Sequence, residues 1–345
     1  MVGHPGTDDF VAALPKAEIH LHLEGAIDLD TIVWLRRQRG ERDEPDLRLR
    51  LAGLYAHRDF LHFLQNYRAL CAELRRPEDF SAVVAALCAR LARDHTRYAE
   101  VMCSPLIFTR QGMPLDEIMA AVSAAARRGE AEHGVVLRFL FDGVRQWGVG
   151  AFEALIGMAL DWRAAGVIGV GIGGDERSLP TRVFGAAMRE ARRLGLHTVI
   201  HAGEFDGPRS VWEAIDELGV ERVGHGVRAV EDDVLVKTLA RRGIPLECCP
   251  TSNVRTGVVG SWSEHPIVRL HAAGVRVTVS SDDPALFETT LSDEYRLLQS
   301  RLGLARQDVE QIGLQTIEAT FLDPRERGRL IEQFRQAAAR PGSTS

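Results

Sequence analysis

The chain has 345 residues, of which 45% are hydrophobic and 26% charged, and its formal net charge is −6 at pH 7. This composition provides enough apolar side chains for a buried core, and the negative charge argues against a nucleic-acid or anionic-membrane partner. No apolar run is long enough to cross a bilayer, and residues 1–20 lack the pattern of a signal peptide. Five cysteines without paired spacing do not form a disulfide framework. We therefore expect a cytoplasmic protein.

The first predicted strand covers residues 17–23, where apolar and polar residues alternate after a short lead-in over residues 1–14. His20 and His22 are two positions apart, so on a strand both imidazoles point to the same side. Glu24 is expected at the rim of the sheet, and Gly25 is expected to let the chain turn away. An isolated pair of this kind is more often explained by core histidines than by a metal site.

A helical insertion is predicted over residues 28–93. Helices are expected at 28–39 and 79–93, and apolar residues between positions 60 and 74 recur at helical spacing. The charged segment 40–50, which contains Pro45, is typical of an exposed loop.

After this insertion, strands and helices alternate regularly. Strands are predicted at 97–103, 135–141, 167–172, 197–200, 222–223, 244–248 and 275–279, and helices at 115–133, 151–165, 181–194, 211–218, 232–241 and 265–273. With the first strand this makes eight β–α units, the number that closes a barrel. A doubly wound sheet would commonly have a glycine-rich turn after its first strand, and none is present. We predict one (β/α)8 TIM barrel over residues 1–345, with a helical tail from residue 293 that packs over it.

The carboxyl ends of the predicted strands have matching chemistry, which overturns the reading as core histidines. These ends contain His20, His22, His201, Glu204, His225, Asp282 and Asp283. Side chains at the carboxyl ends of barrel strands converge on the barrel axis. Three imidazoles and one carboxylate (His20, His22, His201 and Asp282) suit a divalent metal, zinc first, with iron or manganese left open.

The remaining strand-end residues suit proton transfer. A metal ion lowers the pKa of bound water towards ~7. Glu204, His225 and Asp283 would lie beside it, where a carboxylic acid can protonate a nitrogen and an imidazole can steer water. This set favours hydrolysis at a carbon that bears a nitrogen leaving group.

In sequence order, the motifs are Leu14-Pro15-Lys16-Ala17-Glu18-Ile19-His20-Leu21-His22-Leu23-Glu24-Gly25, Gly173-Gly174-Asp175-Glu176, His201-Ala202-Gly203-Glu204, Gly224-His225-Gly226, Cys249-Pro250-Thr251-Ser252-Asn253 and Ser281-Asp282-Asp283-Pro284. With this set, the chain resembles the adenosine deaminase family of metal-dependent amidohydrolases over nearly its whole length.

The resemblance implies a zinc ion bound by His20, His22, His201 and Asp282. It also implies that Glu204 protonates N1 of a purine while zinc hydroxide attacks C6, with His225 orienting the hydroxide. Asp283 would hold N7, and the backbone of Gly174 would meet N3.

One position departs from the family pattern, which has aspartate where this chain has Glu24. In the family that side chain helps to bind the ribose, so Glu24 is a candidate substrate contact that puts the sugar end in doubt. Gly-His-Gly around His225 resembles the nucleoside deaminases. The expected substrate is therefore adenosine or 2′-deoxyadenosine, followed by 6-aminodeoxyfutalosine and then adenine. An amide or phosphoester hydrolase and a non-enzymatic nucleoside-binding barrel are more distant alternatives, and the oligomeric state stays open.

Overall fold

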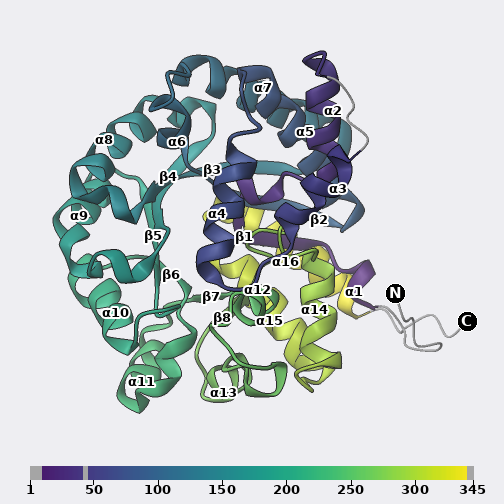
Figure 1. Ribbon diagram of the computed structural model, residues 1–345. Coiled ribbons are helices and arrows are strands. Elements are labelled where there is room, and N and C mark those ends of the chain that lie inside the picture. Colours follow the sequence, from purple (N-terminus) through teal and green to yellow (C-terminus); the bar gives the residue numbers. More distant parts are fainter. Residues whose placement is uncertain (1–9, 42–45, 340–345) are drawn as a thin grey trace, which may run out of the picture.

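A parallel barrel of eight strands forms the centre of the computed structural model, which describes residues 10–41 and 46–339. Each strand pairs with the next one in the chain, in the order β1 to β8 (Figure 1). The strands are β1 Lys16–His22, β2 Thr96–Cys103, β3 Val136–Val144, β4 Val167–Gly173, β5 His197–Ala202, β6 Arg222–His225, β7 Leu246–Cys248 and β8 Val277–Val279. The predicted barrel is confirmed.

The first and last strands meet through a backbone bridge at Asp282, three residues beyond the end of β8. The His22 N–H donates to the Asp282 carbonyl at 2.8 Å, and the Asp282 N–H donates to the His20 carbonyl at 3.1 Å. A parallel bridge therefore pairs Leu21 with Asp282. This bridge joins the two edges of the sheet and holds residue 282 beside β1.

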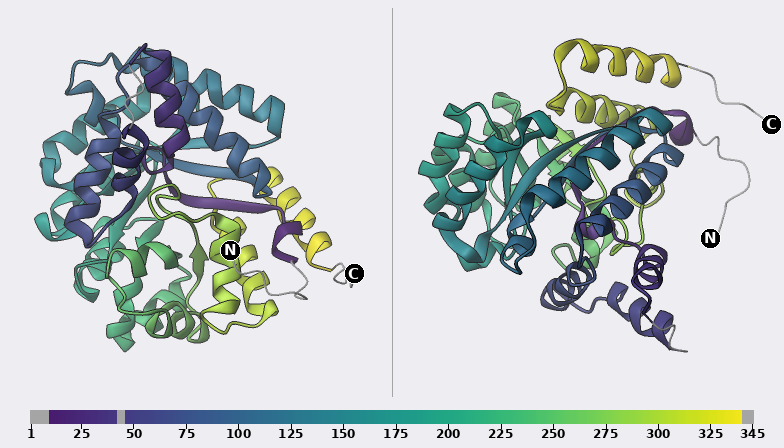
Figure 2. Two further views of the ribbon diagram at one scale, coloured as in Figure 1. Left: turned by 45° about the vertical axis from the view of Figure 1, so that its right-hand side comes forward. Right: turned by 90° about the horizontal axis from the view of Figure 1, so that it is seen from above.

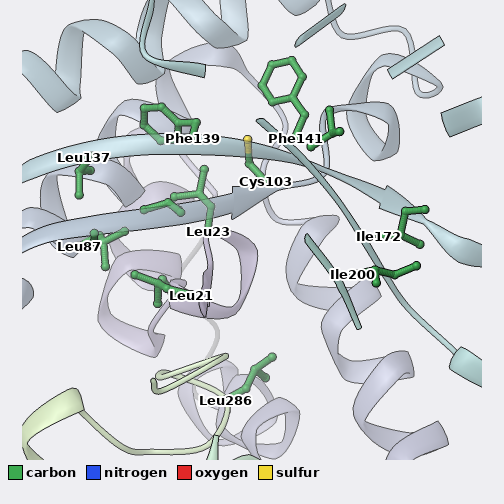
Figure 3. Packing of buried hydrophobic residues seen from close by; sticks show 14 of the residues in the cluster. Leu21, Leu23, Leu87, Cys103, Leu137, Phe139, Phe141, Ile172, Ile200 and Leu286 are labelled. Carbon is green, nitrogen blue, oxygen red and sulfur yellow. The ribbon is translucent and has the colours of Figure 1, made fainter. Parts of the chain in front are cut away.

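A layer of helices surrounds the strands. It is formed by α7 Leu115–His133, α8 Gly148–Asp161, α9 Gly185–Arg193, α10 Pro208–Trp212, α11 Asp233–Arg242 and α13 Ile267–Ala272. A π-helix, Glu213–Leu218, continues α10. At alternate positions along the strands, buried apolar side chains pack against the surrounding helices. Figure 3 shows four of them, Leu21, Phe139, Ile172 and Ile200, each from a different strand. This leaves the other face of each strand for the barrel interior.

The insertion after β1 is helical, as predicted, and consists of α2 Leu29–Gln38, α3 Leu47–Ala52, α4 Phe60–Cys71 and α5 Pro77–Arg93. The exposed loop predicted at 40–50 is wrong in part. Residues 42–45 lie outside the described residues, but α3 occupies the end of that segment. Leu47 and Leu51, one turn apart, are buried and anchor this helix despite the charges around them.

The tail is also helical, with α14 Leu291–Ser300, α15 Arg306–Ala319 and α16 Pro324–Ala338. In the right-hand view of Figure 2, the yellow C-terminal helices and the dark insertion helices α2–α4 lie on opposite sides of the barrel. The tail therefore covers one end of the barrel and leaves the other end to the insertion.

Three short helices were not expected from the sequence. Of the predicted lead-in, residues 1–9 lie outside the described part, and residues 10–13 form α1 (Phe10–Ala13) with Val11 buried. Helices α6 (Pro105–Thr109) and α12 (Pro250–Arg255) each begin with proline shortly after a strand. Proline is favoured at the first helical position, where its missing N–H costs no hydrogen bond. Among the described helices, none combines the length and the apolar character needed to cross a membrane.

We predict that Glu294 makes stability depend on pH. Its buried carboxyl group accepts hydrogen bonds from the Thr251 N–H at 3.0 Å and from the Thr289 hydroxyl at 2.6 Å. Burial outweighs these bonds and raises the pKa of Glu294 from 4.5 to about 7. The folded chain then holds a proton that the unfolded chain releases, so stability falls as pH rises from about 4.5 to about 7.

Glu294→Gln should remove this fall, which amounts to at most about 3 kcal/mol. Urea unfolding at several pH values measures it, with the same substitution at the exposed Glu318 as a control. An unchanged pH dependence in Glu294→Gln would contradict the prediction.

Candidate metal centre and active site

Four of the predicted residues converge at one end of the barrel. His20 and His22 come from β1, His201 from β5, and Asp282 from the bridge after β8. The Nε2 atoms of His20 and His22 each lie 3.4 Å from Asp282 Oδ1. Donor nitrogens of the three histidines lie within 4.8 Å of one another, and all three are buried. The structure thus brings the four residues together.

The donor atoms of this cluster suit a cation. His20 Nε2 and His201 Nε2 are buried and have no hydrogen-bond partner within the described chain. Buried polar atoms of this kind are rare in proteins unless something else satisfies them. Burial lowers the pKa of His22 to about 4 and that of His201 well below its usual range, so both rings keep a free lone pair at neutral pH. Three imidazoles and a carboxylate fit a divalent metal, zinc among them.

Cys249 is a further sulfur donor beside this cluster, within 4.8 Å of donor atoms of His20 and Asp282. Burial, together with the neighbouring Asp282 carboxylate, raises the pKa of the Cys249 thiol well above its usual range. Since a metal binds the thiolate, this environment favours the histidines and the carboxylate as ligands.

His20 is held from behind by a buried carboxylate that we did not predict. Its Nδ1 lies 2.8 Å from Glu247 Oε2 on β7. Burial opposes the charge on His20, but the neighbouring carboxylates of Asp282 and Glu247 outweigh it and raise the pKa of His20 to about 10. The ring therefore lies between two carboxylates, where positive charge is favoured. A carboxylate behind a histidine fixes the tautomer and orientation of a metal ligand.

Glu247 is itself fixed by a buried arginine. Arg222 Nε donates to Glu247 Oε1 at 2.5 Å, and another nitrogen of the same guanidinium pairs with Glu100. The guanidinium carbon lies 3.7 Å from the centroid of the Phe321 ring, which belongs to the tail. A buried polar chain thus links the tail to His20. The sequence offered one signal, since Glu247 is a charged residue within a short apolar strand.

Two residues suited to proton transfer stand next to the metal ligands. His225 Nε2 lies 3.7 Å from Glu204 Oε2 and 3.9 Å from Asp282 Oδ2. Burial, and then the Asp282 carboxylate, raise the pKa of Glu204 well above its usual range, which favours the protonated form of its carboxyl group. Burial lowers the pKa of His225 to about 3, so its imidazole is neutral. Its Nδ1 lies 3.2 Å from the Asn253 side-chain amide.

Strained backbone occurs at two of these positions. His225 and Asp282 have φ of 56° and 64°, a region that residues other than glycine rarely adopt. Such conformations cost about 1–3 kcal/mol and cluster at functional sites. Here they turn the side chains at the ends of β6 and β8 towards the same point.

The turn that contains Glu204 is organised by Glu176. This carboxylate is buried and accepts the backbone N–H groups of Glu204, Phe205 and Asp206 at 3.0, 2.7 and 2.9 Å. Because the bonds go to the backbone, Glu176 positions Glu204 without facing the cavity.

A cavity of about 410 Å³ opens onto the cluster. Gly174 and Asp283 both line it, as predicted for substrate contacts. Gly174 has a φ of +93°, and Asp283 Oδ1 is buried without a hydrogen-bond partner in the described chain. Burial and the adjacent Asp282 raise the pKa of Asp283 well above its usual range, which favours the protonated form that can donate a hydrogen bond.

The rim position expected for Glu24 is wrong. Glu24 is 1% exposed and is not part of the cavity lining. It accepts the Ser104 N–H at 2.9 Å and the Tyr67 hydroxyl at 3.2 Å, and both partners line the cavity. Glu24 thus stands behind the wall and supports it. The chain does turn at Gly25, within the 3-10 helix Glu24–Ala26, and this glycine also makes room for Asp283, because a Cβ there would lie 1.7 Å from Asp283 Oδ1.

The comparisons with known proteins agree with this geometry. The chain is 36% identical to the aminodeoxyfutalosine deaminase of Streptomyces coelicolor, over 94% of this chain and 84% of that protein. It is 37% identical to the adenine deaminase of Rhizobium leguminosarum bv. trifolii, over 93% and 99%. A solved amidohydrolase from Burkholderia ambifaria with bound Zn has a TM-score of 0.89 and 29% identity, over 98% and 95%.

A family model described as adenosine deaminase matches residues 15–337. This match spans the barrel, the insertion and the tail, and contains every residue of the cluster. The chain belongs to the adenosine deaminase family.

Proposed function

We propose that this chain catalyses the hydrolytic deamination of a 6-aminopurine compound, with aminodeoxyfutalosine as its preferred substrate. The observation that supports the reaction most strongly is that a cluster suited to a cation and the buried carboxyl group of Glu204, whose pKa is raised, line one cavity. The relatives named above are deaminases, which supports the same chemistry.

In this proposal His20, His22, His201 and Asp282 hold one zinc ion, which when bound supplies Lewis-acid activation of water. Glu204 donates its proton to the ring nitrogen N1, which makes C6 a better electrophile. Neutral His225 orients the attacking water through Nε2, since the Asn253 amide nitrogen donates to Nδ1 and fixes the ring. Asp283 donates to N7, and the backbone of Gly174 meets N3. One proton of the attacking water passes to the 6-amino nitrogen, so ammonia leaves as the C6–N bond breaks, and the other proton returns to Glu204.

The substrate differs from the one expected from the sequence. Adenosine ranked first there, whereas the relatives in the comparisons are named for aminodeoxyfutalosine and adenine. The cavity volume of about 410 Å³ lies in the range of sites for drug-sized ligands, about 300–1,000 Å³, and exceeds what a free base fills. This volume favours an extended nucleoside over adenine.

A substrate panel tests the proposed reaction. Purified protein with measured zinc content is assayed for ammonia release from aminodeoxyfutalosine, adenosine, 2′-deoxyadenosine and adenine. We expect kcat/KM to be at least about tenfold higher for aminodeoxyfutalosine, the order of one lost favourable contact. A higher value for another 6-aminopurine would correct the substrate, and no release from any of them would refute the reaction.

Glu204→Gln should lower kcat by about 10² or more, because it removes the proton donor while keeping the side-chain shape. Metal content and melting temperature should stay close to those of the parent protein. The same substitution at the exposed Glu190 is the control. Unchanged turnover in Glu204→Gln would refute its role as the acid.

Glu247→Gln should weaken zinc binding by about 10–100-fold, because His20 loses the carboxylate that orients it. Glu100→Gln is a matched control: it also loses a partner of Arg222 but does not contact His20. Chelator competition measures the affinity in both variants. Equal weakening in the two would mean that Glu247 acts only through Arg222 and the stability of the barrel.

A further inference from the structure

The outer part of the cavity contains two arginines that the described chain does not neutralise. Arg68 comes from α4, and Arg110 follows α6 directly. Both line the cavity and are exposed, in contrast to the buried metal end. Within residues 10–41 and 46–339 neither guanidinium forms an ion pair with a carboxylate. Both guanidinium groups are therefore available to an anion.

Arg110 is held in a defined plane. Its guanidinium carbon lies 4.0 Å from the centroid of the Trp147 ring, and Trp147 also lines the cavity. Stacking on an indole face orients the guanidinium while its N–H groups stay free at the edge. That edge matches the two oxygens of a carboxylate. The arrangement is therefore preorganised for a planar anion.

Charge is distributed unevenly along the cavity. Its acidic lining residues, Asp142, Glu204, Asp282 and Asp283, are all buried at the metal end, whereas both arginines are exposed. The remaining wall is largely apolar, with Phe60, Phe63, Leu64 and Ile107 among its residues. A ligand that matches this lining has a neutral base at one end, an apolar middle and an acid at the other end.

We propose that Arg110, together with Arg68, binds a carboxylate at the far end of the substrate and so selects 6-aminopurine nucleosides that are extended by an aromatic acid. This inference rests on the proposed function and identifies the residues that would give it its specificity. Aminodeoxyfutalosine has an aromatic carboxylic acid attached beyond its sugar, whereas adenine and adenosine have no acid. The substrate discrimination then comes from charge at the cavity mouth and not from the purine site.

The test compares aminodeoxyfutalosine with its methyl ester, which keeps the aromatic ring and its carbonyl group and loses the charge. For the parent protein we expect kcat/KM to be about tenfold or more higher for the acid, through KM, as one charged hydrogen bond would give. Arg110→Gln should remove most of this preference, Arg68→Gln part of it, and Arg110→Lys should restore part. Arg241→Gln, on the exposed surface of α11 and outside the cavity lining, is the control and should keep the full preference.

Two further readouts separate the possible failures. The preference for the acid should shrink as salt rises, because the arginines are exposed and their field is screened. The proposed carboxylate site would be refuted if Arg110→Gln lowered kcat/KM equally for the acid and the ester. It would also be refuted if the parent protein did not prefer the acid. If the parent protein deaminates no 6-aminopurine, the proposed function fails, and calorimetric binding of acid and ester to the same variants still tests the subsite. The carboxylate site would be supported if the parent protein bound the acid more tightly than the ester and Arg110→Gln abolished this difference. Equal binding of acid and ester to the parent protein would refute the site.

Discussion

The site depends on the backbone bridge between β1 and Asp282. Its two hydrogen bonds, His22 N–H to the Asp282 carbonyl and Asp282 N–H to the His20 carbonyl, join the barrel edges. They also fix the relative positions of three of the four proposed metal ligands. Because strand residues two apart point to one side, the bridge sets both imidazoles against the carboxylate at 3.4 Å. The contact that closes the barrel therefore also positions the proposed metal ligands.

Electrostatics adds a second constraint to this geometry. Buried carboxylates flank His20, with Asp282 on the cavity side and Glu247 behind. Negative charge in a water-poor interior is costly unless it is paired. Arg222, which pairs with Glu247 and Glu100, neutralises part of this negative charge. A cation bound on the cavity side would neutralise the rest. The interior of the barrel is therefore arranged around positive charge, part of it supplied by the chain and part left to an ion.

Residues at the strand ends were predictable because the β–α alternation is strong and its period places those ends at one rim. For that reason His20, His22, His201 and Asp282 could be grouped from spacing alone. Glu247, Arg222 and Glu176 could not be assigned in this way, because their roles depend on partners that are distant in sequence. Two predictions failed because tertiary packing outweighs the local sequence pattern. The segment 40–50 was predicted as an exposed loop, but it ends in a helix whose Leu47 and Leu51 are buried. Glu24 was predicted at the rim, but it is buried behind the cavity wall.

The central claim is that one divalent ion binds between β1, β5 and the bridge after β8. Crystals grown with zinc and measured at the zinc absorption edge test it directly, since anomalous scattering locates the ion without assumptions about activity. A single strong peak is expected between the Nε2 atoms of His20, His22 and His201 and the Asp282 carboxylate. Its distance from each of these atoms should be the ~2.0–2.2 Å typical of zinc. A peak held by Cys249 without His201, or no peak at this end of the barrel, would contradict it.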